Sequence, residues 1–162
     1  MERMWAPWRV EYISKTNATC FLCEALARKD TAQSLIVEKG SLAFSIMNRF
    51  PYNNGHILVA PTRHVGLFEQ LNDGEVLEIN RLLSRLIKSM NSTMKPHGFN
   101  IGVNQGQIAG AGLLTHIHFH CVPRWQGDTN FMPVLGNAKV ISEGLQATYK
   151  KIKDGLSKLD QL

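Results

Sequence analysis

Histidine alternates with apolar residues over residues 116–122, which read HIHFHCV. Because successive side chains of a β-strand point to opposite faces, this alternation predicts a strand with all three histidines on one face. The apolar residues between them, and Cys121 with them, then face the other way and pack into the core. We place this strand at residues 114–122, ended by Pro123. The segment therefore predicts a sheet whose two faces differ in chemistry.

The three histidines, His116, His118 and His120, do not suit a single metal ion. Residues two apart on a strand lie roughly 6.5–7 Å apart, whereas metal–nitrogen bonds are about 2.0–2.1 Å long. We therefore expect the histidines to divide roles between them. Titrating groups clustered in this way point to a functional site. The structural alternative is a solvent-exposed histidine face without chemistry.

Shorter apolar runs predict the rest of the sheet. Residues 35–38 and 42–47 flank Lys39-Gly40-Ser41, which is a hairpin signal. Residues 56–60 and 99–104 predict two further strands. Together with the histidine strand, these segments predict an antiparallel sheet of about five strands.

An apolar stripe predicts one long helix. Apolar residues recur at steps of three and four over residues 76–94, and Asn72 fits an N-cap with Glu75 three residues on. Residues 21–29 predict a short helix and residues 138–158 a C-terminal helix. Strands joined mainly by hairpin-length loops, with helices between them, indicate the α+β class.

The length of 162 residues fits a single domain. We expect an N-terminal arm over residues 1–19, docked by Trp5 and Trp8, and a C-terminal helical tail over residues 138–162. No apolar run approaches the roughly 18 residues that span a bilayer, and the start has no apolar signal core. We therefore expect a cytoplasmic protein without a membrane partner.

The chain is basic, with 18 Lys and Arg against 13 Asp and Glu, a net charge of +5. A basic protein of this size suits anionic partners, although net charge alone does not separate nucleotides from nucleic acids. Part of the excess lies on the predicted C-terminal helix, and we interpret it as a solvated face. Its residues are Lys150, Lys151, Lys153 and Lys158.

A glycine-rich loop precedes the histidine strand. Gly106, Gly110 and Gly112 permit positive φ and close backbone approach, so successive N–H groups can form a nest for an anion. A glycine loop alone is more often a turn. Beside an imidazole row, an anion nest is what phosphoryl or nucleotidyl transfer requires.

Three cysteines are present, and Cys20 and Cys23 form a C-x-x-C motif. In a reduced compartment this motif indicates half of a zinc site or a redox pair. No strand pattern precedes the pair, which disfavours the redox interpretation. The remaining alternative is that both are simply small buried residues. Cys121 faces away from the histidines, and we expect it in the core.

The alternating histidines behind a glycine loop resemble the histidine triad (HIT) superfamily of nucleotide hydrolases and transferases, over residues 20–125. Supporting segments are Asn48, residues 55–61 and Asn104. Residues 123–131 read PRWQGDTNF and resemble the bacterial branch similar to diadenosine tetraphosphate phosphorylase. The resemblance implies a HIT-like fold with a long helix and a C-terminal helix.

The resemblance also implies roles for residues. His118 matches the nucleophile, His120 a catalytic position that lines the phosphate, and His56 an outer catalytic histidine close to the triad. We expect a backbone carbonyl to hold the other ring nitrogen of His118. Asn48 matches a ribose contact and Asn104 a contact near the phosphates or leaving group. Substrate contacts are also expected from the loop glycines Gly110 and Gly112. Weaker contacts to the base are expected from the strand residues Phe44 and Ile46.

One departure concerns the phosphate contacts. Many family members carry Gln and then Ser or Thr where this chain has Gly112 and Leu113. Backbone N–H groups then replace the missing hydroxyl.

Two further residues have local interpretations. We expect His97 at the surface, where a helix ends, and Trp125 either stacks on a purine or packs against the protein.

Related uridylyltransferases and some bacterial HIT proteins bind zinc through C-x-x-C, a distant histidine and the first histidine of the triad. The matching residues are Cys20, Cys23, His64 and His116. Two thiolates and two imidazoles make a closed tetrahedral site, which is the structural type. Such a site would tie the N-terminal arm to the histidine strand and remove His116 from acid–base chemistry.

The resemblance implies an enzyme that cleaves dinucleoside polyphosphates through a nucleotidyl-histidine, most closely a diadenosine tetraphosphate phosphorylase, with structural zinc and no organic cofactor. It also implies a homodimer with a continuous sheet and no stable nucleic-acid partner. The alternatives are a hydrolase of nucleoside phosphoramidates or dinucleotides, and a non-catalytic, zinc-stabilised nucleotide-binding protein. A DNA-end deadenylating enzyme would need appended DNA-binding segments, which this chain lacks.

Overall fold

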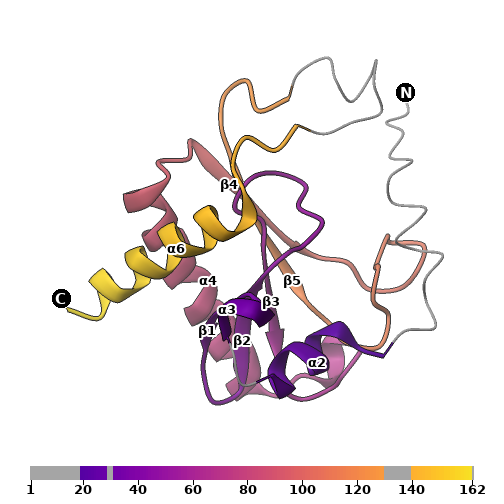
Figure 1. Cartoon of the computed structure of the whole chain (residues 1–162). Helices are drawn as coiled ribbons and strands as arrows, with labels where there is room; N and C mark the ends of the chain where they lie inside the picture. The colour runs from indigo at the N-terminus through magenta and orange to yellow at the C-terminus, as the bar shows by residue number, and fades with distance from the viewer. Residues whose placement is uncertain (1–18, 29–30, 130–139, 162) are drawn as a thin grey trace.

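The computed structural model describes residues 19–28, 31–129 and 140–161 (Figure 1). Trp5 and Trp8 of the predicted arm lie outside the described residues. A five-stranded sheet with strand order β1-β2-β3-β5-β4 forms the centre, and every neighbouring pair is antiparallel. The α+β prediction is therefore confirmed. The strands are β1 Ile36–Lys39, β2 Ala43–Met47, β3 Ile57–Pro61, β4 Gly98–Val103 and β5 Phe119–Arg124.

The prediction of a strand over residues 114–122 is wrong at both ends, because β5 spans Phe119–Arg124. Before it, the backbone N–H of Ile117 donates to the carbonyl of Val65, in a loop, at 2.7 Å. At the other end, Pro123 continues the strand. The pairing of β5 with β3 extends only to Cys121, so among the described residues no strand pairs with Pro123 on that side of β5.

The long helix α4, Asp73–Thr93, begins as predicted. The Asn72 side chain accepts from the N–H of Glu75, and the Glu75 carboxylate accepts from the N–H of Asn72, each at 2.9 Å. The predicted stripe is buried, with Ile79, Leu86 and Met90 all at 0% exposure. The helix packs against β2 and β3 and belongs to the core rather than to a binding surface.

The C-terminal helix α6, Leu145–Leu159, begins later than the predicted residue 138. It crosses α4 and also contacts β1 (Figure 1). The crossing is close at Gly155, where a Cβ atom would lie 2.2 Å from Oγ of Ser89. None of the described helices is long and apolar enough to cross a membrane. The shorter helices are α2 Phe21–Ala27, α3 Thr31–Ser34 and the 3₁₀-helix η1 Phe68–Gln70; only α2 was predicted.

The sheet register brings distant residues onto one face. His120 pairs with Leu58 on β3 and with Gly102 on β4. Leu58 in turn pairs with Ile46 on β2. Because paired residues share a face, the histidine face runs across the centre of the sheet.

Candidate active site and metal centre

Three imidazoles meet on this face of the sheet. His120 lies in β5, His118 immediately precedes that strand, and His56 immediately precedes β3. The ring centroids of His118 and His120 are 5.2 Å apart, and those of His56 and His120 are 5.1 Å apart. The structure therefore brings together the three residues predicted as catalytic.

His118 is held in one tautomer. Its Nδ1 lies 2.9 Å from the carbonyl oxygen of His116. Because a carbonyl only accepts hydrogen bonds, Nδ1 carries the proton and Nε2 keeps its lone pair. The side chain is only 5% exposed, and this burial lowers the pKa of His118. The ring is therefore neutral near pH 7, as a nitrogen nucleophile must be, and the expected backbone acceptor is present.

His56 fixes the tautomer of His120 in the same way. The backbone N–H of Tyr52 donates to Nδ1 of His56 at 3.1 Å, so the proton of His56 lies on Nε2. That nitrogen donates to Nδ1 of His120 at 2.9 Å, which leaves the His120 proton on Nε2. Burial, followed by the charges of His120 and His118, lowers the pKa of His56 to about 3. His120 is thereby prepared to donate from Nε2.

Tyr52 is a residue that the sequence prediction missed. Its ring stacks on His120, with centroids 5.6 Å apart and an interplanar angle of 19°, and lies 4.6 Å from the ring of His56. The signal that could have found it is an aromatic residue in the asparagine-rich loop directly before His56. Tyr52 contacts both histidines through its ring and one through its backbone.

The predicted substrate contacts lie around this centre. The amide nitrogen of Asn48 lies 3.3 Å from Nδ1 of His56. Val103 pairs with Phe119, so the next residue, Asn104, lies level with His118 at the end of β4. Their substrate-binding roles stay predictions.

The glycine loop adopts part of the predicted geometry. Gly106 and Gly110 have φ of 85° and 88°. Gly112 does not use this freedom, because its φ is not positive. The N–H of Ala111 closes the loop on the carbonyl of Gly106 at 3.2 Å. The phosphate-binding role of the loop remains a prediction.

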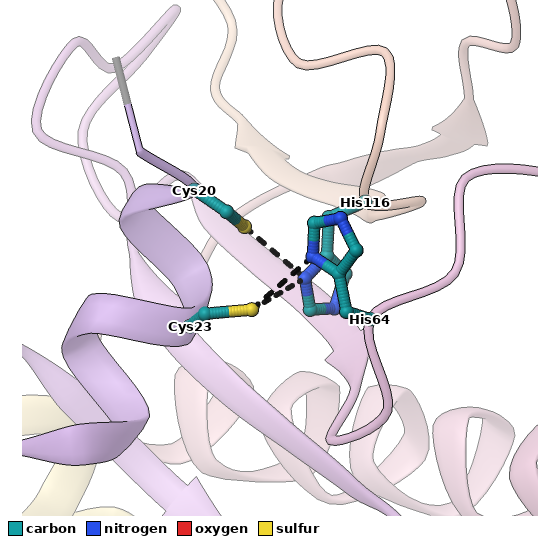
Figure 2. Close-up of side chains that lie close together, drawn as sticks. All are labelled: Cys20, Cys23, His64 and His116. Atoms are coloured by element: carbon teal, nitrogen blue, oxygen red, sulfur yellow. Dashed lines mark hydrogen bonds between the residues drawn. The ribbon is translucent and has the colours of Figure 1, made fainter.

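A second cluster lies beside the first. Figure 2 shows Cys20 and Cys23, from the start of α2, pointing toward the rings of His64 and His116. One ligand atom from each of the four residues lies within 4.8 Å of all the others. Sγ of Cys20 is 3.3 Å from Nδ1 of His116, and Sγ of Cys23 is 3.2 Å from Nδ1 of His64. The four residues predicted as metal ligands therefore converge.

This donor set fits a zinc ion. At zinc bond lengths of about 2.0–2.3 Å, the corners of a tetrahedron lie about 3.3–3.8 Å apart, which matches the sulfur–nitrogen distances. Nε2 of His116 donates to the carbonyl of Pro61 at 2.9 Å, so its Nδ1 directs a lone pair at the cysteines. Burial and the neighbouring Cys20 raise the pKa of Cys23 to about 11, and a cation among the four donors would reverse that shift.

An ion pair braces the loop that carries His64. The Arg63 guanidinium donates to both carboxylate oxygens of Glu75, at 2.9 and 2.8 Å, and to the carbonyl of Gln70 at 2.8 Å. Glu75 also caps α4, so the long helix and the His64 loop are joined. The sequence prediction found the cap but missed this second role of Glu75.

The other residues that the sequence singled out have local roles. His97 is exposed and accepts the N–H of Gln126 at 2.9 Å, as a surface residue. The indole N–H of Trp125 donates to the carbonyl of Met94 at 3.3 Å, which favours packing over purine stacking. The core position expected for Cys121 is confirmed, and burial raises its pKa to about 12. Phe44 and Ile46 share the histidine face but are buried, and their base contact stays a prediction.

Several known proteins are similar to this chain in sequence or in fold. The chain is 34% identical over 157 residues to AP-4-A phosphorylase of Mycobacterium tuberculosis, which covers 91% of this chain and 80% of the relative. It is 24% identical over 149 residues to adenosine 5'-monophosphoramidase HNT1 of Candida albicans, covering 90% and 96% respectively. A zinc-bound histidine triad family protein from Mycobacterium smegmatis superposes with a TM-score of 0.72 at 22% identity, covering 88% and 96%.

The family model described as HIT domain matches residues 29–127. The match contains all three alternating histidines as well as His56 and His64, whereas Cys20 and Cys23 lie before it. The matched region spans more than half of the chain. The chain belongs to the HIT domain family.

Proposed function

We propose that the protein transfers nucleotidyl groups from dinucleoside polyphosphates through a nucleotidyl-histidine, as a phosphorylase of diadenosine tetraphosphate. One observation carries the proposal: the 2.9 Å hydrogen bond from Nδ1 of His118 to the carbonyl of His116, which directs the lone pair to Nε2. The activity named for the M. tuberculosis relative supports the same substrate class. This makes His118 the nucleophile.

In the first step, Nε2 of His118 attacks the α-phosphorus in line and forms a P–N bond. The bond from that phosphorus to the bridging oxygen breaks, and its electron pair leaves with the departing ATP. The N–H of His120 donates to this oxygen as its charge develops. The carbonyl of His116 stabilises the positive charge that the imidazole of His118 acquires.

In the second step, an oxygen of orthophosphate attacks the same phosphorus and forms ADP. The P–N bond breaks, and its electron pair returns to Nε2 of His118. Water as the acceptor would give AMP by the same geometry. The choice of phosphate follows the name of the 34% identical relative.

Product analysis tests the proposal. We expect the purified protein to convert diadenosine tetraphosphate to ADP and ATP only when orthophosphate is present. AMP and ATP without phosphate would identify a hydrolase instead. No turnover under either condition would contradict the enzymatic assignment and favour a nucleotide-binding protein.

A phosphoramidase is the second candidate, because the relative from Candida albicans carries that name. The same nucleophile can attack an α-phosphorus that bears a nitrogen leaving group. The ratio of kcat/KM for adenosine 5'-phosphoramidate to that for diadenosine tetraphosphate separates the two candidates. A ratio well above one would favour the phosphoramidase.

We also propose a structural zinc ion at Cys20, Cys23, His64 and His116. Bound there, the ion would supply a closed cross-link and no catalytic chemistry. The residues come from the start of α2, the loop after β3 and the segment before β5, so the link would join three separate parts of the chain. Metal analysis of the freshly purified protein is the test, with one zinc per chain expected.

A homodimer is proposed on the geometry of the sheet edge. β4 is an edge strand, and Ile101 on it is 49% exposed. A second copy pairing along β4 would continue the sheet and cover this residue. Light scattering should give twice the chain mass, and Ile101→Lys should reduce it toward one chain. We further propose that residues 1–162 form one domain in the cytoplasm, where the thiols of the metal centre stay reduced.

A further inference from the structure

A cavity of about 260 Å³ lies next to the catalytic histidines and has no role in the chemistry above. It lies further along β5, on the face that carries His118 and His120, because Val122 and Arg124 follow them at steps of two. Same-face steps of about 6.8 Å put Val122 roughly 14 Å from His118 along the strand. The lining residues are Tyr52, Asn53, Asn100, Val122, Arg124 and Thr129.

Among the described residues that line the cavity, Arg124 is the one cation, and it is paired. The Arg124 guanidinium donates to both oxygens of Asp128, at 2.7 and 2.9 Å, and to Oδ1 of Asn100 at 2.7 Å. Its charge is therefore neutralised within the wall. An orthophosphate or polyphosphate site would need cations that are not already paired in this way.

The wall suits a nucleoside instead. The amide nitrogen of Asn53 donates to the carbonyl of Pro123 at 3.0 Å and to Asp128 at 2.7 Å, which leaves its oxygen as an acceptor. Asn100 is oriented the opposite way, because its oxygen accepts from Arg124 and its nitrogen remains a donor. The donor of Asn100 and the acceptor of Asn53 suit the polar edge of a base. The Tyr52 ring and the apolar Val122 suit its flat face.

Tyr52 connects the cavity to the chemistry. The ring that stacks on His120 also lines the cavity. In the proposed mechanism His120 donates to the oxygen of the departing group, and this cavity lies beyond His120 along β5. Three phosphates separate the attacked phosphorus of diadenosine tetraphosphate from its second nucleoside, a reach of the same order as the distance along the strand.

We propose that this cavity binds the second nucleoside of a dinucleoside polyphosphate, the one that departs, by contacts from Tyr52, Asn53 and Asn100. The inference rests on the proposed function for its substrate class. It makes the enzyme selective for substrates with a nucleoside at both ends of the phosphate chain. Arg124 and Asp128 act as positioning residues that orient the two amides.

The test compares two substrates with the same phosphate chain: diadenosine tetraphosphate, with two nucleosides, and adenosine 5'-tetraphosphate, with one. Thr129→Trp should fill the cavity from its exposed rim and lower the ratio of their kcat/KM values about tenfold. Gln126→Trp, three residues earlier and also exposed, is the matched control and should leave the ratio within about twofold.

A second variant keeps the side-chain volume. Asn100→Asp retains the acceptor for Arg124 but replaces the donor with a carboxylate oxygen, and should lower the same ratio. Asn91→Asp, exposed on α4, adds the same charge away from the cavity and is its control. Equal losses for both substrates, or a ratio that stays constant in both cavity variants, would overturn the inference. A rise in the KM for orthophosphate alone would do so as well, by identifying an acceptor site.

Binding separates failure of this inference from failure of the proposed function. In a His118→Asn background, calorimetry measures the affinity for each nucleotide without turnover. The inference predicts that diadenosine tetraphosphate binds more tightly than adenosine 5'-tetraphosphate and that Thr129→Trp abolishes this difference. That result would support nucleoside binding in the cavity even if the native protein turns over neither substrate. Equal affinities for the two nucleotides would overturn the inference even if the phosphorylase activity is found.

Discussion

His116 and His118 are two residues apart and adopt opposite tautomers. His116 donates from Nε2 to the carbonyl of Pro61 and directs Nδ1 at the cysteines. His118 donates from Nδ1 to the carbonyl of His116 and keeps the lone pair on Nε2. In each ring, the position of a backbone carbonyl decides which nitrogen is available. One short segment thus carries both the proposed metal ligand and the proposed nucleophile.

The two regions differ in what surrounds them. The metal centre draws its donors from three separate parts of the chain, and two of them are thiols. The active site consists of imidazoles held in fixed tautomers, His120 by the ring of His56 and His118 by the carbonyl of His116. The first region should therefore control stability, and the second should control chemistry. They share one group, the carbonyl of His116, through which the metal centre can position the nucleophile.

The largest expected effect is on chemistry alone. His118→Asn should lower turnover of diadenosine tetraphosphate by at least about a thousandfold, because the attacking nitrogen is removed. Bound zinc and the melting temperature should stay near the native values, because His118 is not a ligand. Nucleotide separation by ion exchange measures the first quantity, and metal analysis with thermal unfolding measures the others. Turnover within tenfold of native would contradict the assignment of the nucleophile.

The reverse pattern is expected at the metal centre. Cys23→Ser should abolish stoichiometric zinc binding and lower the melting temperature by about 5–10 °C, as expected for a loss of about 2–3 kcal/mol in a chain of this size. Turnover should fall less than in His118→Asn, by about tenfold, through the loosened carbonyl of His116. Metal analysis and differential scanning calorimetry provide the measurements. Retention of one zinc per chain would remove Cys23 from the site.

The sequence predicted most of both regions, because period-two and helical patterns are local. The alternation around His118 predicted histidines on one face, and the stripe of α4 with its Asn72 cap is confirmed. The four metal ligands came from a family resemblance, since nothing local links Cys20 to His64. The predicted start of β5 was wrong because the N–H of Ile117 donates to the carbonyl of Val65, in a loop, and not to a neighbouring strand.

What the sequence could not predict are contacts made across the fold by side chains without periodicity. Tyr52 reaches His120 only because the loop before β3 folds onto β5. Arg63 reaches Glu75 only because the loop after β3 approaches the start of α4. Both contacts require the tertiary arrangement, and neither follows from a periodic pattern in the chain.

The third effect concerns the pH dependence of stability that the uncharged ring of His56 contributes. Burial and the facing imidazoles of His120 and His118 hold the pKa of His56 at about 3, against about 6.5 when unfolded. Below pH 6.5 the unfolded chain binds a proton that folded His56 rejects, so this residue makes stability fall as the pH decreases. The loss between pH 7 and pH 5 is about 2 kcal/mol.

His56→Gln should remove this contribution. Denaturant unfolding at pH 7 and pH 5 should show a loss of stability about 2 kcal/mol smaller in the variant than in the native protein. The metal centre contributes its own pH dependence to both proteins, so the difference between them isolates His56. An identical loss in the two proteins would mean that His56 is protonated in the folded state.

The smallest effect tests the face of β5 that neither region uses. Cys121 is a cysteine one residue from His120, yet it is fully buried on the opposite face, in contact with the core. Cys121→Ala should cost about 1 kcal/mol of stability, because it leaves a small cavity, and should change neither zinc content nor turnover appreciably. Thermal unfolding, metal analysis and the nucleotide assay measure the three quantities. Cys121 and Cys23 both have a thiol side chain, but only Cys23 lies in the proposed metal centre. A loss of zinc in Cys121→Ala would therefore show that the buried face of β5 also affects metal binding.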